Sequence, residues 1–183
     1  MGKFLFWLLK IFGWKIDESA PIHVKKAIVV VGPHTSNWDF IIGKIAFMKY
    51  NINARFLVKK ELFFFPLGYI MRWFGAIPVD RKKKNNMTVQ VVDLFGKHDE
   101  FYVVFTPEGT RKYQPNWKKG FYYIAMEAKV PILIAYMDYK KKIGGFHSVF
   151  EPTGNVDGDI KQIKNILADY TGKIPENGIR KED

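Results

Sequence analysis

Short apolar runs alternate with amphipathic segments along most of the chain. The apolar runs are rich in β-branched and aromatic residues, and they predict buried strands at residues 27–31, 54–58, 76–79, 101–105 and 132–139. The segments between them have helical spacing and predict helices at residues 39–50, 67–74, 86–96 and 117–129. After a turn at 140–145 we expect a returning hairpin strand at 146–150, then a helix capped by Asp157 or Asp159 that ends near Gly172. This alternation predicts a single α/β domain with a mixed, largely parallel sheet flanked by helices.

Residues 1–16 are strongly apolar but contain lysines, and they predict an amphipathic helix. On a helical wheel one face is apolar, Lys3 and Lys10 share the opposite face, and Trp7 and Trp14 flank these lysines. Amphipathic rings beside cations suit the headgroup level of a bilayer, so we expect this helix to associate with a membrane surface. The alternative is a helix packed on its own domain. The uninterrupted apolar run is much shorter than the about 20 residues of a bilayer span.

The composition describes a folded, basic chain. It has 183 residues, of which 48% are hydrophobic, and this excludes a disordered basic tail. We assign residues 20–172 to the folded domain and expect residues 173–183 to be a polar, frayed tail. Lys and Arg exceed Asp and Glu by 29 − 18 = +11, so we expect an anionic partner: nucleic acid, an anionic membrane surface or phosphorylated small molecules. Cysteine is absent, which excludes a disulfide framework and a thiol nucleophile.

Candidate chemistry lies directly after the first buried strand. His34 precedes the predicted helix and Asp39 lies near its first turn, so the imidazole can donate a hydrogen bond to the carboxylate. The carboxylate would fix the tautomer and leave the second ring nitrogen free to accept a proton, as a general base for a hydroxyl does. The alternative is a histidine that only caps the helix. No metal is expected, because His34, Asp39 and Glu108 match no zinc-ligand spacing.

A second candidate group follows the strand at residues 101–105. The Pro-Glu-Gly turn exposes Glu108, Thr110 and Arg111, and Arg81 follows another predicted strand. A carboxylate accepts hydrogen bonds from hydroxyls and an arginine binds phosphate with two donors, so these residues suit a polyol phosphate. The alternative for each arginine is an ion pair that fixes a loop.

Together these segments resemble the glycerolipid acyltransferase family, whose best-known members convert lysophosphatidic acid to phosphatidic acid. The matching span, residues 32–135, covers over half of the chain in the right order. The family's four motifs fall on His34 and Asp39, on residues 75–81, on residues 106–112 and on residues 130–132.

The resemblance implies transfer of an acyl group from acyl-CoA or acyl-carrier protein to the hydroxyl of a lysophospholipid, in first place 1-acylglycerol-3-phosphate, in phospholipid biosynthesis. His34 would be the general base oriented by Asp39. Glu108, Gly109, Thr110 and Arg111 would shape the acceptor pocket, and Arg81 would bind its phosphate. No cofactor is implied beyond the acyl donor.

The expected location is peripheral (monotopic), on the cytoplasmic face of a membrane. The acceptor headgroup, the acyl-chain length, the donor carrier and the oligomeric state stay open.

Two other readings compete with this one. A nucleic-acid-binding domain would need aromatic stacking platforms in a basic groove, and most aromatic residues here lie in runs that look buried, so we expect no nucleic-acid partner. A catalytically silent membrane-binding module on the same fold would not need His34, Asp39 and Glu108. The aromatic run 63–65 is expected in the core, with an acyl-chain channel as its alternative.

Overall fold

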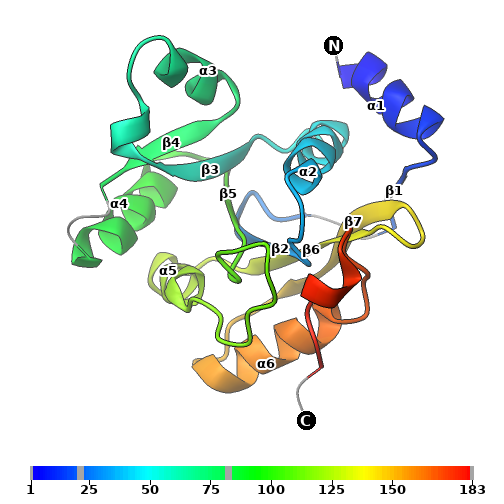
Figure 1. Cartoon of the computed structure of the whole chain (residues 1–183). Helices are drawn as coiled ribbons and strands as arrows, with labels where there is room; N and C mark the ends of the chain where they lie inside the picture. The colour runs from blue at the N-terminus through cyan, green and yellow to red at the C-terminus, as the bar shows by residue number, and fades with distance from the viewer. Residues whose placement is uncertain (1, 20–22, 81–83, 182–183) are drawn as a thin grey trace.

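The computed structural model of the chain describes residues 2–19, 23–80 and 84–181, and it shows one α/β domain built on a seven-stranded sheet (Figure 1). The sheet order is β1-β7-β6-β2-β5-β3-β4, and every neighbouring pair is parallel except the β6–β7 hairpin. The strands are β1 (Lys15–Asp17), β2 (Lys26–Gly32), β3 (Ala54–Lys59), β4 (Ala76–Val79), β5 (Phe101–Phe105), β6 (Ile132–Asp138) and β7 (Ile143–Phe150). The predicted fold class, a mixed and largely parallel sheet flanked by helices, is confirmed.

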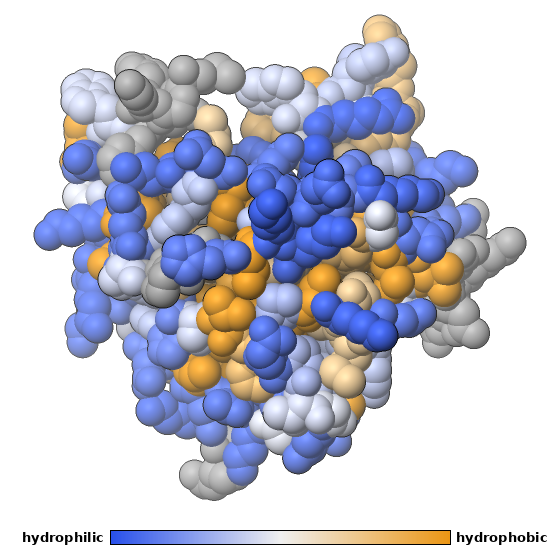
Figure 2. Space-filling model, turned by 180° about the vertical axis from the view of Figure 1, so that it is seen from behind, coloured by the Kyte–Doolittle hydropathy of each residue, from blue (hydrophilic) through white to orange (hydrophobic). Residues whose placement is uncertain are grey.

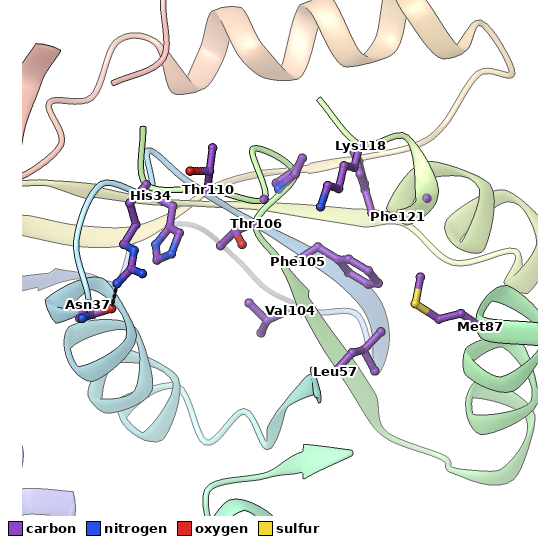
Figure 3. A pocket seen from close by; sticks show the side chains of 14 residues that line it. His34, Asn37, Leu57, Met87, Val104, Phe105, Thr106, Thr110, Lys118 and Phe121 are labelled. Atoms are coloured by element: carbon purple, nitrogen blue, oxygen red, sulfur yellow. Dashed lines mark hydrogen bonds between the residues drawn. The ribbon is translucent and has the colours of Figure 1, made fainter. Parts of the chain in front are cut away.

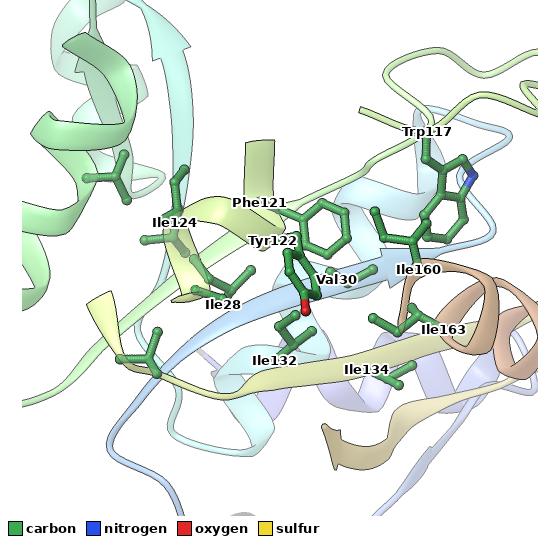
Figure 4. Packing of buried hydrophobic residues seen from close by; sticks show 14 of the residues in the cluster. Ile28, Val30, Trp117, Phe121, Tyr122, Ile124, Ile132, Ile134, Ile160 and Ile163 are labelled. Atoms are coloured by element: carbon green, nitrogen blue, oxygen red, sulfur yellow. The ribbon is translucent and has the colours of Figure 1, made fainter. Parts of the chain in front are cut away.

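Helices cover both faces of the sheet (Figure 1). They are α1 (Gly2–Ile11), α2 (Trp38–Lys49), α3 (Leu67–Trp73), α4 (Lys84–Lys97), α5 (Gly120–Ala128) and α6 (Val156–Leu167), with 3₁₀ turns η1 (Lys60–Leu62) and η2 (Pro175–Asn177). Because side chains alternate across a strand, β2 divides its apolar residues between two cores. Ile28 and Val30 face α4, α5 and α6, whereas Val29 and Val31 face α1 and α2. Figure 4 shows the first core, where Phe121 and Tyr122 of α5 lie over Ile132 and Val30.

The N-terminal segment differs from the predicted helix over residues 1–16. Helix α1 ends at Ile11, and Gly13 takes a positive φ of 79° that turns the chain, as a glycine after a helix often does. Lys15–Asp17 then forms an edge strand beside β7. Trp14 is therefore buried and packs edge-on against Tyr139, with ring centroids 4.9 Å apart. The expectation that Trp14 flanks a membrane-facing lysine row is wrong, because the helix ends before it.

Smaller differences concern the other end of the chain. Helix α6 is capped by Asn155, which accepts from the Gly158 N–H, while the Asp159 carboxylate is buried and accepts from the Tyr122 hydroxyl. This helix ends at Leu167, earlier than expected, and β7 begins at Ile143, inside the predicted turn. The predicted helix at residues 117–129 begins only at Gly120.

The described part of the C-terminal tail is packed and not frayed. The Ile174 N–H donates to Thr35 Oγ1 over 3.2 Å, and a Cβ added at Gly172 would lie 2.7 Å from the Thr35 side chain. The tail therefore supports the loop that follows β2, and its contacts with this loop extend past residue 172.

Candidate active site

The loop between β2 and α2 brings His34 and Asp39 together, as the sequence predicted. His34 Nδ1 lies 3.1 Å from Asp39 Oδ2, and the same oxygen accepts from the Thr35 and Ser36 N–H groups, each over 2.8 Å. The second oxygen, Oδ1, accepts from the Tyr139 hydroxyl over 2.6 Å. Among the described residues, the Asp39 carboxylate thus accepts hydrogen bonds from its own loop and from Tyr139, the residue after β6.

The electrostatics of Asp39 fix the tautomer of His34. Burial by itself would raise the pKa of Asp39, but hydrogen bonds from His34, Tyr139 and the Ser36 backbone outweigh burial and hold that pKa below its ordinary value. The carboxylate is therefore ionised and accepts only, so Nδ1 of His34 carries the proton. In a neutral imidazole with its proton on Nδ1, the lone pair lies on Nε2, which is the arrangement that a general base requires.

Glu108 lies beneath this dyad and does not line the adjoining pocket. Its carboxyl group is buried and accepts from the His34 N–H, 3.0 Å from Oε2. Burial raises the pKa of Glu108 to about 8, the negative charge of Asp39 adds to this rise, and the His34 N–H opposes it. Because β2 and β5 are paired neighbours, this contact fastens the His34 loop to the Pro-Glu-Gly turn across the carboxyl edge of the sheet.

The other residues of that turn reach the surface beside His34. Gly109 has a φ of 65°, and a Cβ there would lie 2.8 Å from the Lys118 side chain. The Arg111 guanidinium donates to Asn37 Oδ1, so the two loops are joined a second time. Thr110 and Lys118 line the pocket, and no described carboxylate forms an ion pair with Lys118.

A pocket of about 800 Å³ opens between these loops and α4. Figure 3 shows His34 and Thr110 at one end and Met87 at the other, with the rings of Phe105 and Phe121 between them. One end of the pocket is therefore polar and basic, and the other is apolar.

A second cavity of about 290 Å³ runs between α2 and the sheet. It shares His34 with the pocket and continues along Phe40, Phe47, Phe56 and Met137. His34 thus lies where two spaces meet.

The backbone amides beside the dyad donate hydrogen bonds to acceptors within the protein. The Gly109 N–H donates to the Thr106 carbonyl, and the amides of His34, Thr35 and Ser36 donate to Glu108 or Asp39. These amides therefore hold the loops in shape and are not free to stabilise an oxyanion.

The structure brings most of the predicted residues together. His34, Asp39, Glu108, Gly109, Thr110 and Arg111 meet at one edge of the sheet. Arg81 and the side chain of Lys3 lie outside the described residues. Trp7 and Lys10 are exposed on α1, away from this edge.

Three residues of the site were not predicted: Asn37, Lys118 and Tyr139. Asn37 and Lys118 gave a weak signal, since each lies beside a motif that the sequence analysis used. Tyr139 gave none, because its contact with Asp39 spans 100 positions in the chain.

The described residues contain no group of three His, Asp or Glu side chains placed to hold a metal ion. Across the same residues, no helix has the length and apolar character that crossing a membrane requires.

The chain is similar in sequence to known proteins. The sequence model of the Acyltransferase family matches residues 14–137. The chain is 30% identical over 139 residues to the 1-acyl-sn-glycerol-3-phosphate acyltransferase of Streptococcus pneumoniae, a match that covers 71% of this chain and 51% of that protein. It is 28% identical over 130 residues to the human 1-acyl-sn-glycerol-3-phosphate acyltransferase beta, covering 67% and 46%. The chain thus spans about half the length of the curated relatives it matches.

A solved structure shares the fold. The crystal structure of the 1-acyl-sn-glycerophosphate (LPA) acyltransferase PlsC from Thermotoga maritima superimposes with a TM-score of 0.62. The match covers 91% of this chain and 74% of that chain at 18% sequence identity.

Proposed function

The chain belongs to the acyltransferase family, and on that premise we propose that it moves a fatty acyl group from an acyl thioester to the hydroxyl of a lysophospholipid. The observation that carries this proposal is the His34–Asp39 pair, whose free Nε2 lies where a basic pocket meets an apolar cavity. The first acceptor to test is 1-acylglycerol-3-phosphate, because two relatives bear that name. The product would be phosphatidic acid, a step of phospholipid biosynthesis.

The proposed reaction needs one proton acceptor and no covalent enzyme intermediate. Nε2 of His34 takes the proton from the acceptor hydroxyl, and the oxygen attacks the thioester carbonyl. The tetrahedral intermediate collapses, the carbon–sulfur bond breaks, and the thiolate leaves with the proton that the imidazolium returns. Asp39 stabilises the imidazolium, and general-base assistance of this kind contributes about 10²–10⁴-fold to a rate.

The basic end of the pocket suits the phosphate of the acceptor, and the apolar cavity suits a fatty acyl chain. We assign the acceptor phosphate to Lys118 and Arg111, which lie on the loop after β5, and by resemblance also to Arg81. The fatty acyl chain would occupy the apolar cavity along Phe40 and Phe56. Glu108 would act through the His34 loop that it holds, rather than by binding the acceptor hydroxyls.

Membrane association through α1 is part of the same proposal. Trp7, Ile11 and Phe12 are exposed, and Lys10 is exposed beside them, so the described end of α1 offers apolar and basic groups to a headgroup layer. We propose a peripheral position on the cytoplasmic face, where anionic lipids and acyl donors are both present.

The deciding experiment compares the wild type with His34→Ala. Purified protein is incubated with acyl-CoA or acyl-carrier protein and a panel of lysolipids, and thiol release and the diacyl product are measured. We expect turnover with at least one acceptor and a loss of about 10³-fold in His34→Ala. His147→Ala is the matched control, because His147 is exposed on β7, where it is hydrogen-bonded to Ser148 and its ring lies edge-on to Tyr170, outside the dyad. Equal inactivity of the wild type and His34→Ala across the panel would refute the proposal and favour a silent module.

A further inference from the structure

A cluster of exposed apolar side chains covers α3 and the turn before it. Phe65 is 82% exposed, Tyr69 68% and Trp73 67%. The sequence predicted residues 63–65 to lie in the core or to line an acyl-chain channel; Phe64 and Phe65 do neither. We call this cluster the α3 patch; its residues are Leu62, Phe64, Phe65, Tyr69, Ile70, Trp73 and Phe74.

The patch is held in shape from behind. Gly68 is buried so tightly that a Cβ there would lie 2.9 Å from the Phe63 backbone carbonyl. The Arg72 guanidinium lies over the Phe63 ring, 5.4 Å from its centroid. The aromatic side chains therefore point outward from a fixed turn.

Basic residues flank the patch. Lys59, Lys60 and Arg72 against Glu61 give the segment a net charge of 3 − 1 = +2. Aromatic rings with flanking cations match the headgroup level of an anionic bilayer, where Trp and Tyr are enriched and each basic residue adds attraction. A second copy of the chain is a poorer partner, because each copy carries +11 and two such rims would repel.

The patch does not lie alone. The described residues contain 19 exposed large hydrophobic side chains; 12 of them belong to α1, α2 and the α3 patch, and one more, Phe12, directly follows α1. Figure 1 shows these three helices at the same end of the molecule. Seen from behind, the projection at upper right, where α3 lies, carries pale and tan residues above a blue, hydrophilic band (Figure 2). One side of the domain is therefore apolar at its outer edge.

The patch is continuous with the proposed acyl-chain cavity. The ring of Phe40 on α2 contacts Phe74 of the patch, with centroids 6.3 Å apart, and Phe56 inside the cavity, 5.0 Å apart. Phe40 itself lines the cavity that reaches His34. Apolar side chains therefore extend from the outer edge of α3 toward the proposed base, with Lys44 beside them, where its Nζ donates to the Phe74 carbonyl and lies over the Phe56 ring.

We propose that the α3 patch inserts into an anionic lipid bilayer and forms a second membrane contact beside α1. The patch places the Phe40 end of the cavity at the lipid surface, so that a lipid substrate enters without crossing water.

The first test measures partitioning of the full chain onto lipid vesicles. We expect Phe65→Ser/Trp73→Ser to lower the partition coefficient on vesicles of phosphatidylcholine and phosphatidylglycerol by about tenfold or more, since two large apolar side chains leave the bilayer. Tyr123→Ser is the matched control, because Tyr123 is a half-exposed aromatic on α5 and we expect its partitioning to equal that of the wild type. Wild-type partitioning of the double variant would show that α1 suffices and would overturn the proposal.

The second test locates the patch relative to the bilayer. The chain has no cysteine, so Phe65→Cys and Tyr123→Cys each accept a single environment-sensitive fluorophore. We expect vesicles to shift the emission at position 65 to the blue and brominated lipid to quench it, with neither effect at position 123. An unchanged emission at position 65 in vesicle-bound protein contradicts insertion.

A third measurement tests whether a second copy of the chain, rather than lipid, covers the α3 patch. Sedimentation equilibrium without lipid should give the same mass for the wild type and the double variant. A wild-type dimer that Phe65→Ser/Trp73→Ser dissociates, with unchanged vesicle binding, would assign the patch to a second copy. None of these experiments needs turnover, so failed insertion and failed acyl transfer are separate results.

Discussion

Removing the Tyr139 hydroxyl tests whether the dyad is positioned from outside its own loop. Tyr139→Phe keeps the ring against Trp14 and deletes the 2.6 Å hydrogen bond to Asp39 Oδ1. A hydrogen bond to a charged group contributes about 1.5–3 kcal/mol to stability. We therefore expect the free energy of unfolding at neutral pH to fall by about that amount and kcat/KM to fall about tenfold, because Asp39 loses the donor that fixes its plane.

The pH dependence of the free energy of unfolding shows how the Tyr139 hydroxyl acts through Asp39. The pKa of Asp39 is held below its ordinary value of 3.8, so the stability that this carboxylate contributes is present above that pH and is lost as the pH falls through its folded pKa. In Tyr139→Phe one of the groups that lower this pKa is missing. The difference between variant and wild type in urea unfolding should thus be largest near neutral pH and shrink in acid.

A matched variant separates positioning from stability. Tyr136 also donates to a carboxylate over 2.6 Å, but its acceptor is Asp17, which is no part of the dyad. Tyr136→Phe should lose stability while keeping kcat/KM. Equal kcat/KM for Tyr139→Phe and the wild type, or an equal loss in both tyrosine variants, would refute the positioning role.

Three further predictions follow from the packing. Trp14→Ala should lower the free energy of unfolding by about 3–5 kcal/mol in thermal or urea melts, because it empties the space against Tyr139; a loss of vesicle binding alone would contradict burial. Between pH 4.5 and about 8 the unfolded wild-type chain loses a proton that Glu108 keeps in the folded chain, so the free energy of unfolding should fall with rising pH, by at most about 5 kcal/mol at pH 8. Glu108→Gln cannot titrate, so this decline should be absent from its urea melts. Gly172→Ala should cost about 1–3 kcal/mol in the same melts and reduce turnover, because its methyl group displaces Thr35; unchanged turnover would show that the tail does not support the loop.

The parts of the site that the sequence predicted are local or lie at strand ends. His34 and Asp39 are five positions apart on one strand-to-helix loop, so their contact follows from chain geometry. The Glu108 turn follows a strand with the same direction, and carboxyl ends of parallel strands meet at one edge. Tyr139 was missed because its position depends on β6 lying beside β2, a pairing that alternation of strands and helices does not specify.

The N-terminal error has a different cause. A helical wheel assumes that the helix continues, and the wheel over residues 1–16 placed Trp14 beside Lys10. Gly13 ends that regularity with a left-handed φ, which other residues adopt only with strain, and Trp14 then turns into the core. The prediction for Phe65 was wrong in the opposite direction, because this side chain was expected in the core and is exposed. Apolar character predicts that a side chain is covered, but it does not say whether protein or lipid covers it.

On the proposed function, the residues around the general base are held from several directions, whereas the residues proposed to meet the headgroup and the bilayer lie outside this set. Glu108 accepts a hydrogen bond from the backbone N–H of His34, and Asp39 lies within hydrogen-bond distance of the His34 imidazole. The adjacent Thr35 accepts a hydrogen bond at its hydroxyl from the Ile174 N–H of the tail. Such fixing lowers the reorganisation that proton transfer would otherwise require. Lys118 and the α3 patch are exposed, and among the described residues their side chains form no hydrogen bond with His34 or Asp39. On the proposed function, substitutions there should change which headgroup or membrane is preferred while Nε2 of His34 keeps its place, so selectivity and the chemical step should respond independently to mutation.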